Sequence, residues 1–137
     1  TYGPGLRRQV LWDICEKALT QPVLNLRGTG NESRDFIHGR DVAKAIYILA
    51  ERAPCEAEVY NLGSGIETTI KELAELVLSY WENKISLEFD GKVPVGNPVN
   101  WQSDISRLSH LGFIPEVTLS RGLNVYVQWC RAEILGW

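Results

Sequence analysis

Segments with helical periodicity alternate with short extended segments along this chain, and this alternation restricts its fold more than any other feature. Apolar side chains recur at helical spacing over residues 6–20, 41–52, 69–81, 104–111 and 118–135. Strand-like patterns lie between most of these segments, over residues 23–27, 35–38, 58–62 and 85–89. Helices and strands in this order are typical of α/β proteins, so the sequence predicts a mixed α/β fold.

Two of the helical segments also predict their surroundings. Thr69 and Glu72 have the spacing of a capping box, which predicts a helix that begins directly after Thr69. Residues 41–52 are apolar on almost every side, and such a helix is expected to be covered over most of its surface.

Composition excludes several classes of protein. The chain has 137 residues, 45% of them hydrophobic, which fits one globular domain or a large part of one. Its 14 basic and 17 acidic residues give a net charge of −3, so nucleic acid is not an expected partner. No apolar run approaches the roughly 18 residues that a membrane helix needs, so we expect no membrane partner.

The cysteines and histidines do not form recognisable sites. Cys15, Cys55 and Cys130 are odd in number and widely spaced, which indicates reduced thiols and a cytoplasmic protein. His38 and His110 lie far apart and outside any ligand motif, so we expect no metal site.

The first residues indicate a piece of a longer protein. The chain contains no methionine and opens directly into a turn, Thr1-Tyr2-Gly3-Pro4-Gly5. We therefore interpret it as a fragment.

Neither glycine-rich turn has the context of a dinucleotide-binding loop. Gly28-x-Gly30 lacks the third glycine and is followed by a predicted strand, where such a loop would open a helix. Gly63-Ser64-Gly65 lies several residues before the helix at Thr69, so we interpret it as a turn at the exit of the strand over residues 58–62.

Catalytic groups are scarce, and Arg34 is the polar residue with the clearest binding chemistry. Tyr2 has Leu6 and not lysine four residues on, so it cannot supply a Tyr-x-x-x-Lys pair, and we expect no catalytic residue here. Arg34 follows a glycine turn, where its planar fork suits a phosphate or carboxylate. The alternative is a structural ion pair with Asp35 or Asp41, which the residues alone favour.

The order of motifs resembles that of the extended short-chain dehydrogenases/reductases, which include NAD-dependent nucleotide-sugar epimerases and dehydratases. The resemblance rests on Tyr2-Gly3-Pro4-Gly5, Gly28-x-Gly30-x-x-x-Arg34-Asp35-Phe36-Ile37-His38 with Asp41-Val42-Ala43-x-Ala45, Val59-Tyr60-Asn61-Leu62-Gly63-Ser64-Gly65, Asp104-Ile105-Ser106-Arg107, Leu111-Gly112-Phe113-x-Pro115 and Leu119-x-x-Gly122-Leu123. These six pieces occur in family order over nearly the whole chain.

The resemblance implies a fold and a function. Members have a Rossmann half that binds NAD or NADP and a smaller C-terminal half that holds a nucleoside-diphosphate sugar. Residues 1–137 would form that C-terminal half and part of a Rossmann sheet, without the cofactor loop and the catalytic Tyr-x-x-x-Lys. We therefore expect the chain itself to be inactive and to bind no NAD or NADP, which would belong to the full-length protein.

The resemblance also implies roles for individual residues. Arg34 would contact the substrate diphosphate, and the strand from Val23 to Arg27, including Asn25, would lie beside the base. Tyr2 and Gly3 would border the nicotinamide and the sugar.

The sequence departs from the family at one place. Many relatives carry Arg-x-Gly-Asp before the Asp104 motif, but here Pro94-Val95-Gly96-Asn97 lacks the arginine. Lys92 would substitute as a point charge, and Asn97 is a further candidate for substrate binding.

Three functions stay open at this point. The parent protein is an epimerase or dehydratase, it is a nucleotide-sugar 4-ketoreductase, or the chain is a binding module without turnover. In each case the strand over residues 58–62 and the helix after Asp41 would lack the partners they have in the family, so we expect a homo-oligomer.

Overall fold

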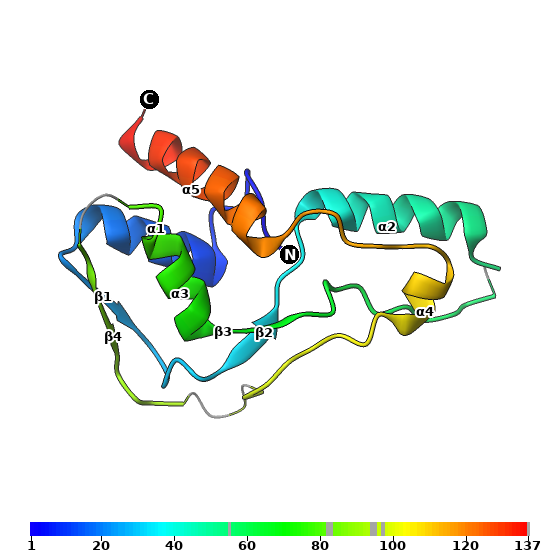
Figure 1. Cartoon of the computed structure of the whole chain (residues 1–137), viewed down its shortest axis with the longest axis horizontal. Helices are drawn as coiled ribbons and strands as arrows, with labels where there is room; N and C mark the ends of the chain where they lie inside the picture. The colour runs from blue at the N-terminus through cyan, green and yellow to red at the C-terminus, as the bar shows by residue number, and fades with distance from the viewer. Residues whose placement is uncertain (55, 82–83, 94–95, 97, 137) are drawn as a thin grey trace.

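The computed structural model describes residues 1–54, 56–81, 84–93, 96 and 98–136, and it is a mixed α/β structure (Figure 1). The elements in chain order are α1 (Gln9–Thr20), β1 (Val23–Leu26), β2 (Ser33–Asp35), α2 (Gly39–Arg52), β3 (Glu67–Thr69), α3 (Ile70–Leu78), β4 (Ser86–Phe89), α4 (Ser106–His110) and α5 (Leu119–Leu135). The predicted α/β class and short mixed strands are confirmed.

Two small sheets join segments that are distant in sequence. β1 and β4 are parallel, with Leu24 opposite Leu87, although more than 60 residues separate them. β2 and β3 are antiparallel, with Ser33 opposite Thr69. A single parallel bridge also joins Tyr2 to His38, where the first residues run beside the chain leading into α2.

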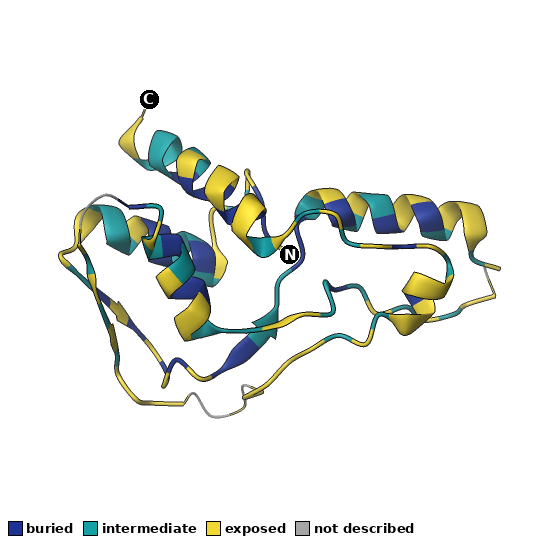
Figure 2. Cartoon of the chain, in the orientation of Figure 1, coloured by how far each residue is buried: buried dark blue, intermediate teal, exposed yellow. Residues whose placement is uncertain are grey.

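The larger core lies between α1, α3 and α5, beside the parallel strands (Figures 1 and 2). Each helix turns one apolar face inward, which Figure 2 shows as dark blue stripes on otherwise yellow and teal ribbons. The buried side chains of this core include Leu11, Ile14, Cys15, Leu24, Leu73, Val77, Leu123, Tyr126 and Cys130. Burial of this apolar surface is the main stabilising contribution to the fold.

A second, smaller core lies at the other end of the molecule, between α2 and α4. It consists of Ile37, Ala45, Ile48, Leu108 and Phe113. This core covers only one face of α2.

The outer face of α2 does not have the cover that its composition predicts. Ile46 is 59% exposed and Tyr47 is 62% exposed. Within the part of the chain that the structure describes, the cover expected from composition is therefore absent, and the exposed face is the one expected of this helix without its family partners.

The strand predicted over residues 58–62 is also wrong. These residues are irregular, and Val59 is 72% exposed. The described residues offer this segment no strand to pair with, and a strand forms only where a neighbour accepts its backbone hydrogen bonds. Gly63-Ser64-Gly65 is therefore not a strand-exit turn.

The helix starts differ from prediction by a few residues, and the reasons are local. α1 begins at Gln9 and not at residue 6, because Arg8 is still extended. α2 begins at Gly39 and not at Asp41, because His38 accepts a hydrogen bond from the backbone N–H of Arg40 and caps the helix. Histidine is not among the usual capping residues, so this start could not be predicted from a capping pattern.

The capping box of α3 is confirmed. Thr69 Oγ1 accepts from the N–H of Glu72 at 3.1 Å, and the Glu72 carboxylate accepts from the N–H of Thr69 at 2.8 Å. None of the described helices is both long and apolar enough to span a bilayer.

Candidate functional site

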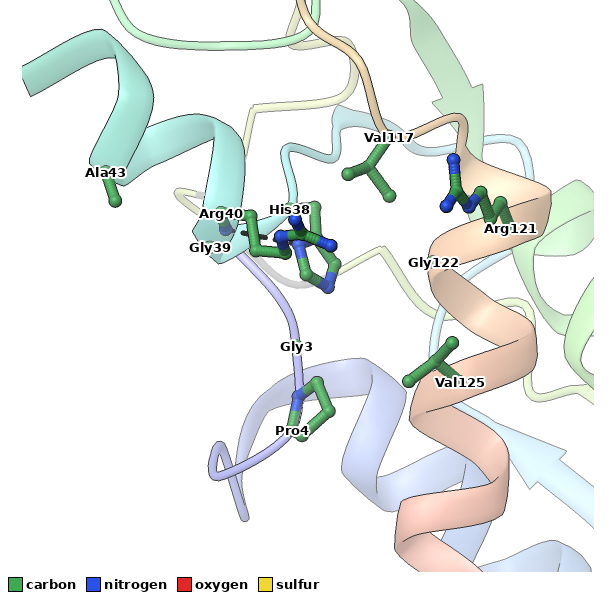
Figure 3. A pocket seen from close by; sticks show the side chains of 10 residues that line it. All are labelled: Gly3, Pro4, His38, Gly39, Arg40, Ala43, Val117, Arg121, Gly122 and Val125. Atoms are coloured by element: carbon green, nitrogen blue, oxygen red, sulfur yellow. Dashed lines mark hydrogen bonds between the residues drawn. The ribbon is translucent and has the colours of Figure 1, made fainter.

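A cavity of about 550 Å³ lies between the first turns of α2 and α5, and the segment around Gly3 forms its third side (Figure 3). Gly3, Pro4, His38, Gly39, Arg40, Ala43, Val117, Arg121, Gly122 and Val125 line it. A cavity of this size holds a small organic molecule.

Two hydrogen bonds, one to the ring of His38 and one next to it in the chain, fix the position of His38 in the cavity wall. Its Nδ1 accepts from the N–H of Arg40 at 3.1 Å, while the N–H of Gly39 donates to the carbonyl of Tyr2 at 2.8 Å. Burial lowers the pKa of His38 below its ordinary value, although the charge of Asp41 opposes this. The imidazole is therefore neutral at pH 7, and its proton lies on Nε2, since Nδ1 is an acceptor.

Arg40 and Arg121 place two positive charges on the cavity. Their side chains reach from α2 and α5 toward the space between these helices (Figure 3). Within the described residues neither guanidinium makes a hydrogen bond or an ion pair, and no acidic side chain lines the cavity.

Tyr2 and Gly3 lie at this cavity, but in different ways. Gly3 lines it, and a Cβ atom there would lie 3.3 Å from Nε2 of His38. Tyr2 is buried behind it, with its ring edge-on to His38 at 5.3 Å between centroids. Burial strongly raises the pKa of Tyr2, so the phenol stays protonated.

Arg34 lies elsewhere, on β2, and it does not line this cavity. Its Nη1 donates to three backbone carbonyls, at 2.6 Å to Ser33, 2.9 Å to Pro98 and 3.5 Å to Val99. Both ion pairs that the residues alone favoured are wrong. Asp35 accepts from Ser64, Gly65 and Ser103.

Asp41, the other predicted ion-pair partner of Arg34, also binds elsewhere. Its carboxylate accepts from the N–H groups of Glu116 and Val117, at 3.1 and 3.0 Å. This contact holds the segment before α5 against the start of α2.

The remaining predicted binding residues lie on or near β1. Val23 and Asn25 are in the strand, Asn25 is exposed, and Arg27 follows it. Lys92 follows the turn after β4, which folds back onto Gly28, and the charges of Lys92 and Arg27 both act on Asp90. Asn97 lies outside the described residues.

Both glycine turns are already occupied by carboxylates of the protein itself. Glu32 accepts from the N–H groups of Thr29 and Gly30, and Asp35 accepts from those of Ser64 and Gly65. A dinucleotide phosphate would need such N–H groups free. These turns therefore do not fit NAD or NADP, in agreement with the interpretation from sequence.

One Tyr-x-x-x-Lys spacing does occur in the sequence, from Tyr80 to Lys84. α3 ends at Leu78, so the two residues do not share a helix. The hydroxyl of Tyr80 donates to the carbonyl of Ser120 at 2.8 Å, so Tyr80 links the segment after α3 to α5.

Sequence reasoning missed His38, Arg40 and Arg121. Arg40 and Arg121 are far apart in sequence, and only the return of α5 to Tyr2 brings them together. Gly122 was noted in the Leu119-x-x-Gly122-Leu123 motif but without a role. Its missing side chain was the one available signal for a close approach of two segments.

Comparisons with known proteins agree on one class. Residues 1–63 match the sequence model of the NAD dependent epimerase/dehydratase family. The chain is 39% identical over 108 residues to the putative GDP-L-fucose synthase 2 of Arabidopsis thaliana, covering 79% of this chain and 32% of that protein. It is 29% identical to the dTDP-L-rhamnose 4-epimerase of Burkholderia thailandensis, covering 97% of this chain and 38% of that protein.

Solved structures share the fold over almost the entire chain. An epimerase from Methanothermobacter thermautotrophicus matches with a TM-score of 0.86 and 25% identity, covering 98% of this chain and 41% of that one. The UDP-N-acetylglucosamine 4-epimerase of Methanobrevibacter ruminantium M1, in complex with UDP-N-acetylmuramic acid, matches with a TM-score of 0.83 and 26% identity, covering 96% of this chain and 44% of that one.

The fold is thus one found in nucleotide-sugar epimerases and in a dTDP-glucose 4,6-dehydratase. The chain is similar, over most of its length, to proteins of the NAD dependent epimerase/dehydratase family, whose sequence model its first 63 residues match. It spans 32% of the length of the Arabidopsis relative.

Proposed function

We propose that residues 1–137 form the nucleotide-sugar-binding region of an NAD(P)-dependent epimerase or dehydratase, and that this region has no turnover by itself. The cofactor would be held by another part of the full-length protein, since both described glycine turns are filled by carboxylates. The relatives are named for GDP-, dTDP- and UDP-sugars, which supports this substrate class.

The observation that carries the proposal is the unused edge of Arg34. All of its hydrogen bonds leave from Nη1, so the Nε–Nη2 edge has no partner within the described residues. That edge is the planar fork that binds two phosphate oxygens at once. The carbonyls of Ser33 and Pro98 hold the guanidinium in place, which lowers the entropy cost of binding.

Binding to sugar nucleotides tests the proposal directly. We expect calorimetric titration with GDP-, UDP-, dTDP- and CDP-sugars to detect binding of at least one. Arg34→Ala should weaken it about tenfold or more, because a charge-assisted bidentate contact is lost. Arg8→Ala is the matched control, since Arg8 is exposed and precedes α1. Absence of binding by the unmodified chain, or equal binding by Arg34→Ala, would refute the proposal.

A GDP-sugar is the first ligand to test. GDP-L-fucose synthases from Arabidopsis thaliana and Escherichia coli are both at least 31% identical to this chain. A nucleotide-sugar 4-ketoreductase is the alternative to an epimerase or dehydratase. Assays of the full-length protein with NADPH and a 4-keto sugar nucleotide would distinguish the two. A module that only binds would give no turnover with any substrate.

A further inference from the structure

The cavity between α2 and α5 carries charge that the fold itself does not use. Arg40 and Arg121 line it from two different helices, and within the described residues neither side chain has a partner. Both side chains are exposed, so their charged groups are free to contact a ligand in the cavity. The neighbouring acidic groups are engaged elsewhere: Asp41 accepts two N–H groups before α5, and Glu116 pairs with Lys44.

A buried donor points into the same space. His38 is only 8% exposed and lines the cavity. Its Nδ1 is occupied by the N–H of Arg40, which leaves the proton on Nε2. Nε2 faces the segment at Gly3 and has no hydrogen-bond partner within the described part of the chain. This N–H can therefore donate to an acceptor on a ligand in the cavity.

The rest of the wall is apolar. Ala43, Val117 and Val125 lie across from Pro4. The first turns of α2 and α5 both face the cavity, and the positive ends of their dipoles add to the two arginine charges. The site therefore combines a cationic rim, one neutral donor and an apolar wall.

We propose that this cavity binds an organic phosphate. The phosphate is held by Arg40 and Arg121, with Nε2–H of His38 donating to one of its oxygens, and the carbon skeleton lies against Val117 and Val125. This site is separate from the sugar-nucleotide contact at Arg34, because Arg34 does not line the cavity.

Phenyl phosphate is a suitable probe, with inorganic phosphate and phenol as the two half-ligands. We expect phenyl phosphate to bind more tightly than inorganic phosphate, and phenol not to bind. The double variant Arg40→Ala/Arg121→Ala should lose about tenfold or more in affinity, since two charge-assisted contacts disappear. Both side chains are exposed and unpaired, so the melting temperature should not change.

Two further variants separate charge from shape. Arg8→Ala removes an arginine outside the cavity and should leave binding unchanged. Ala43→Phe keeps both cavity arginines but fills part of the space, so it should abolish binding of phenyl phosphate while inorganic phosphate still binds. Equal affinity of the double variant and the unmodified chain for phenyl phosphate would overturn the proposal, as would the absence of any binding.

Competition identifies the source of the phosphate and keeps this inference distinct from the proposed function. If GDP displaces phenyl phosphate, the cavity takes a phosphate of the nucleotide itself. If it does not, the ligand is a separate organic phosphate. If GDP does not displace phenyl phosphate, Arg34→Ala should weaken sugar-nucleotide binding and leave phenyl phosphate binding unchanged. Either proposal can then fail while the other stands.

Discussion

The hydroxyl of Tyr2 lies against the bare backbone of Gly122, so close that a Cβ atom on Gly122 would be 2.1 Å from Oη. We predict that Gly122→Ala lowers the free energy of unfolding by about 3 kcal/mol, because overpacking must displace the buried ring of Tyr2. Urea unfolding measures this. Gly39→Ala is the matched control, since its Cβ would meet nothing nearer than the carbonyl of Tyr2 at 3.7 Å.

The same hydroxyl predicts a stabilising substitution. Oη of Tyr2 is buried and has no hydrogen-bond partner among the residues that the structure describes. Tyr2→Phe should raise the free energy of unfolding by about 1 kcal/mol, because the buried group no longer has to be desolvated. It should also relieve part of the cost of Gly122→Ala in the double variant. If the free-energy changes of the two single substitutions simply add in the double variant, the contact between Tyr2 and Gly122 is contradicted.

Asp35 joins three segments, and its loss should be severe. Its carboxylate accepts from the N–H and Oγ of Ser64, from Gly65 and from Ser103. Asp35→Ala should cost about 3 kcal/mol in unfolding experiments, since several donors lose their acceptor. Asp35→Asn should cost less, because the amide keeps one acceptor oxygen. Gly63→Ala should lower the free energy of unfolding by a similar amount, because its Cβ would lie 2.5 Å from Oδ2 of Asp35.

Helices could be predicted from the sequence more securely than strands. The stripe after Thr69 and the capping box predicted α3, because both signals are local. Local signals could not decide whether residues 58–62 form a strand, because a strand needs a neighbouring strand that comes from a distant part of the sequence. β3 was missed for the opposite reason: Glu67, Thr68 and Thr69 are polar, yet they pair with β2.

The candidate site was predictable only in part. Arg34 stood out because it follows a glycine turn in a short segment. The cavity depends on Arg40 and Arg121, which meet only through the packing of α5 against Tyr2, and no local pattern reports that contact.

Acid should weaken the turn between β1 and β2. Burial would raise the pKa of Glu32, but hydrogen bonds from Thr29 and Gly30 together hold it below its usual value. A depressed pKa stabilises the fold above the unfolded value of about 4.3, and this contribution is lost as pH falls through the folded value. Unfolding at pH 7, 5, 4 and 3 should therefore show a smaller acid loss for Glu32→Gln than for the unmodified chain.

The outer face of α2 should promote self-association. Ile46 and Tyr47 are more than half exposed on the same helix. Sedimentation equilibrium should show mass rising with concentration, and Ile46→Asp should reduce this, whereas Val125→Asp on α5 should not. A constant monomer mass at high concentration would argue against the homo-oligomer.

The paired thiols of the core should be inert. A hydrogen bond with Cys130 and burial both raise the pKa of Cys15, whereas the same hydrogen bond lowers the pKa of Cys130. Both residues are fully buried, so a reagent cannot reach either thiol in the folded protein. In a Cys55→Ser background, we expect a thiol reagent at pH 8 to label neither cysteine until denaturant is added. Rapid labelling of the native protein would show that α1 and α5 separate readily.

The packing of α5 against the first residues has a consequence for how the protein is made. Tyr126 donates to the carbonyl of Leu6, and Arg7 pairs with Glu133. On the ribosome, α1 and α3 would wait with their apolar faces open until the last helix leaves the exit tunnel. Chaperones would have their main opportunity during that interval, and a ribosome stalled before residue 119 would hold these residues without the helix that completes their core.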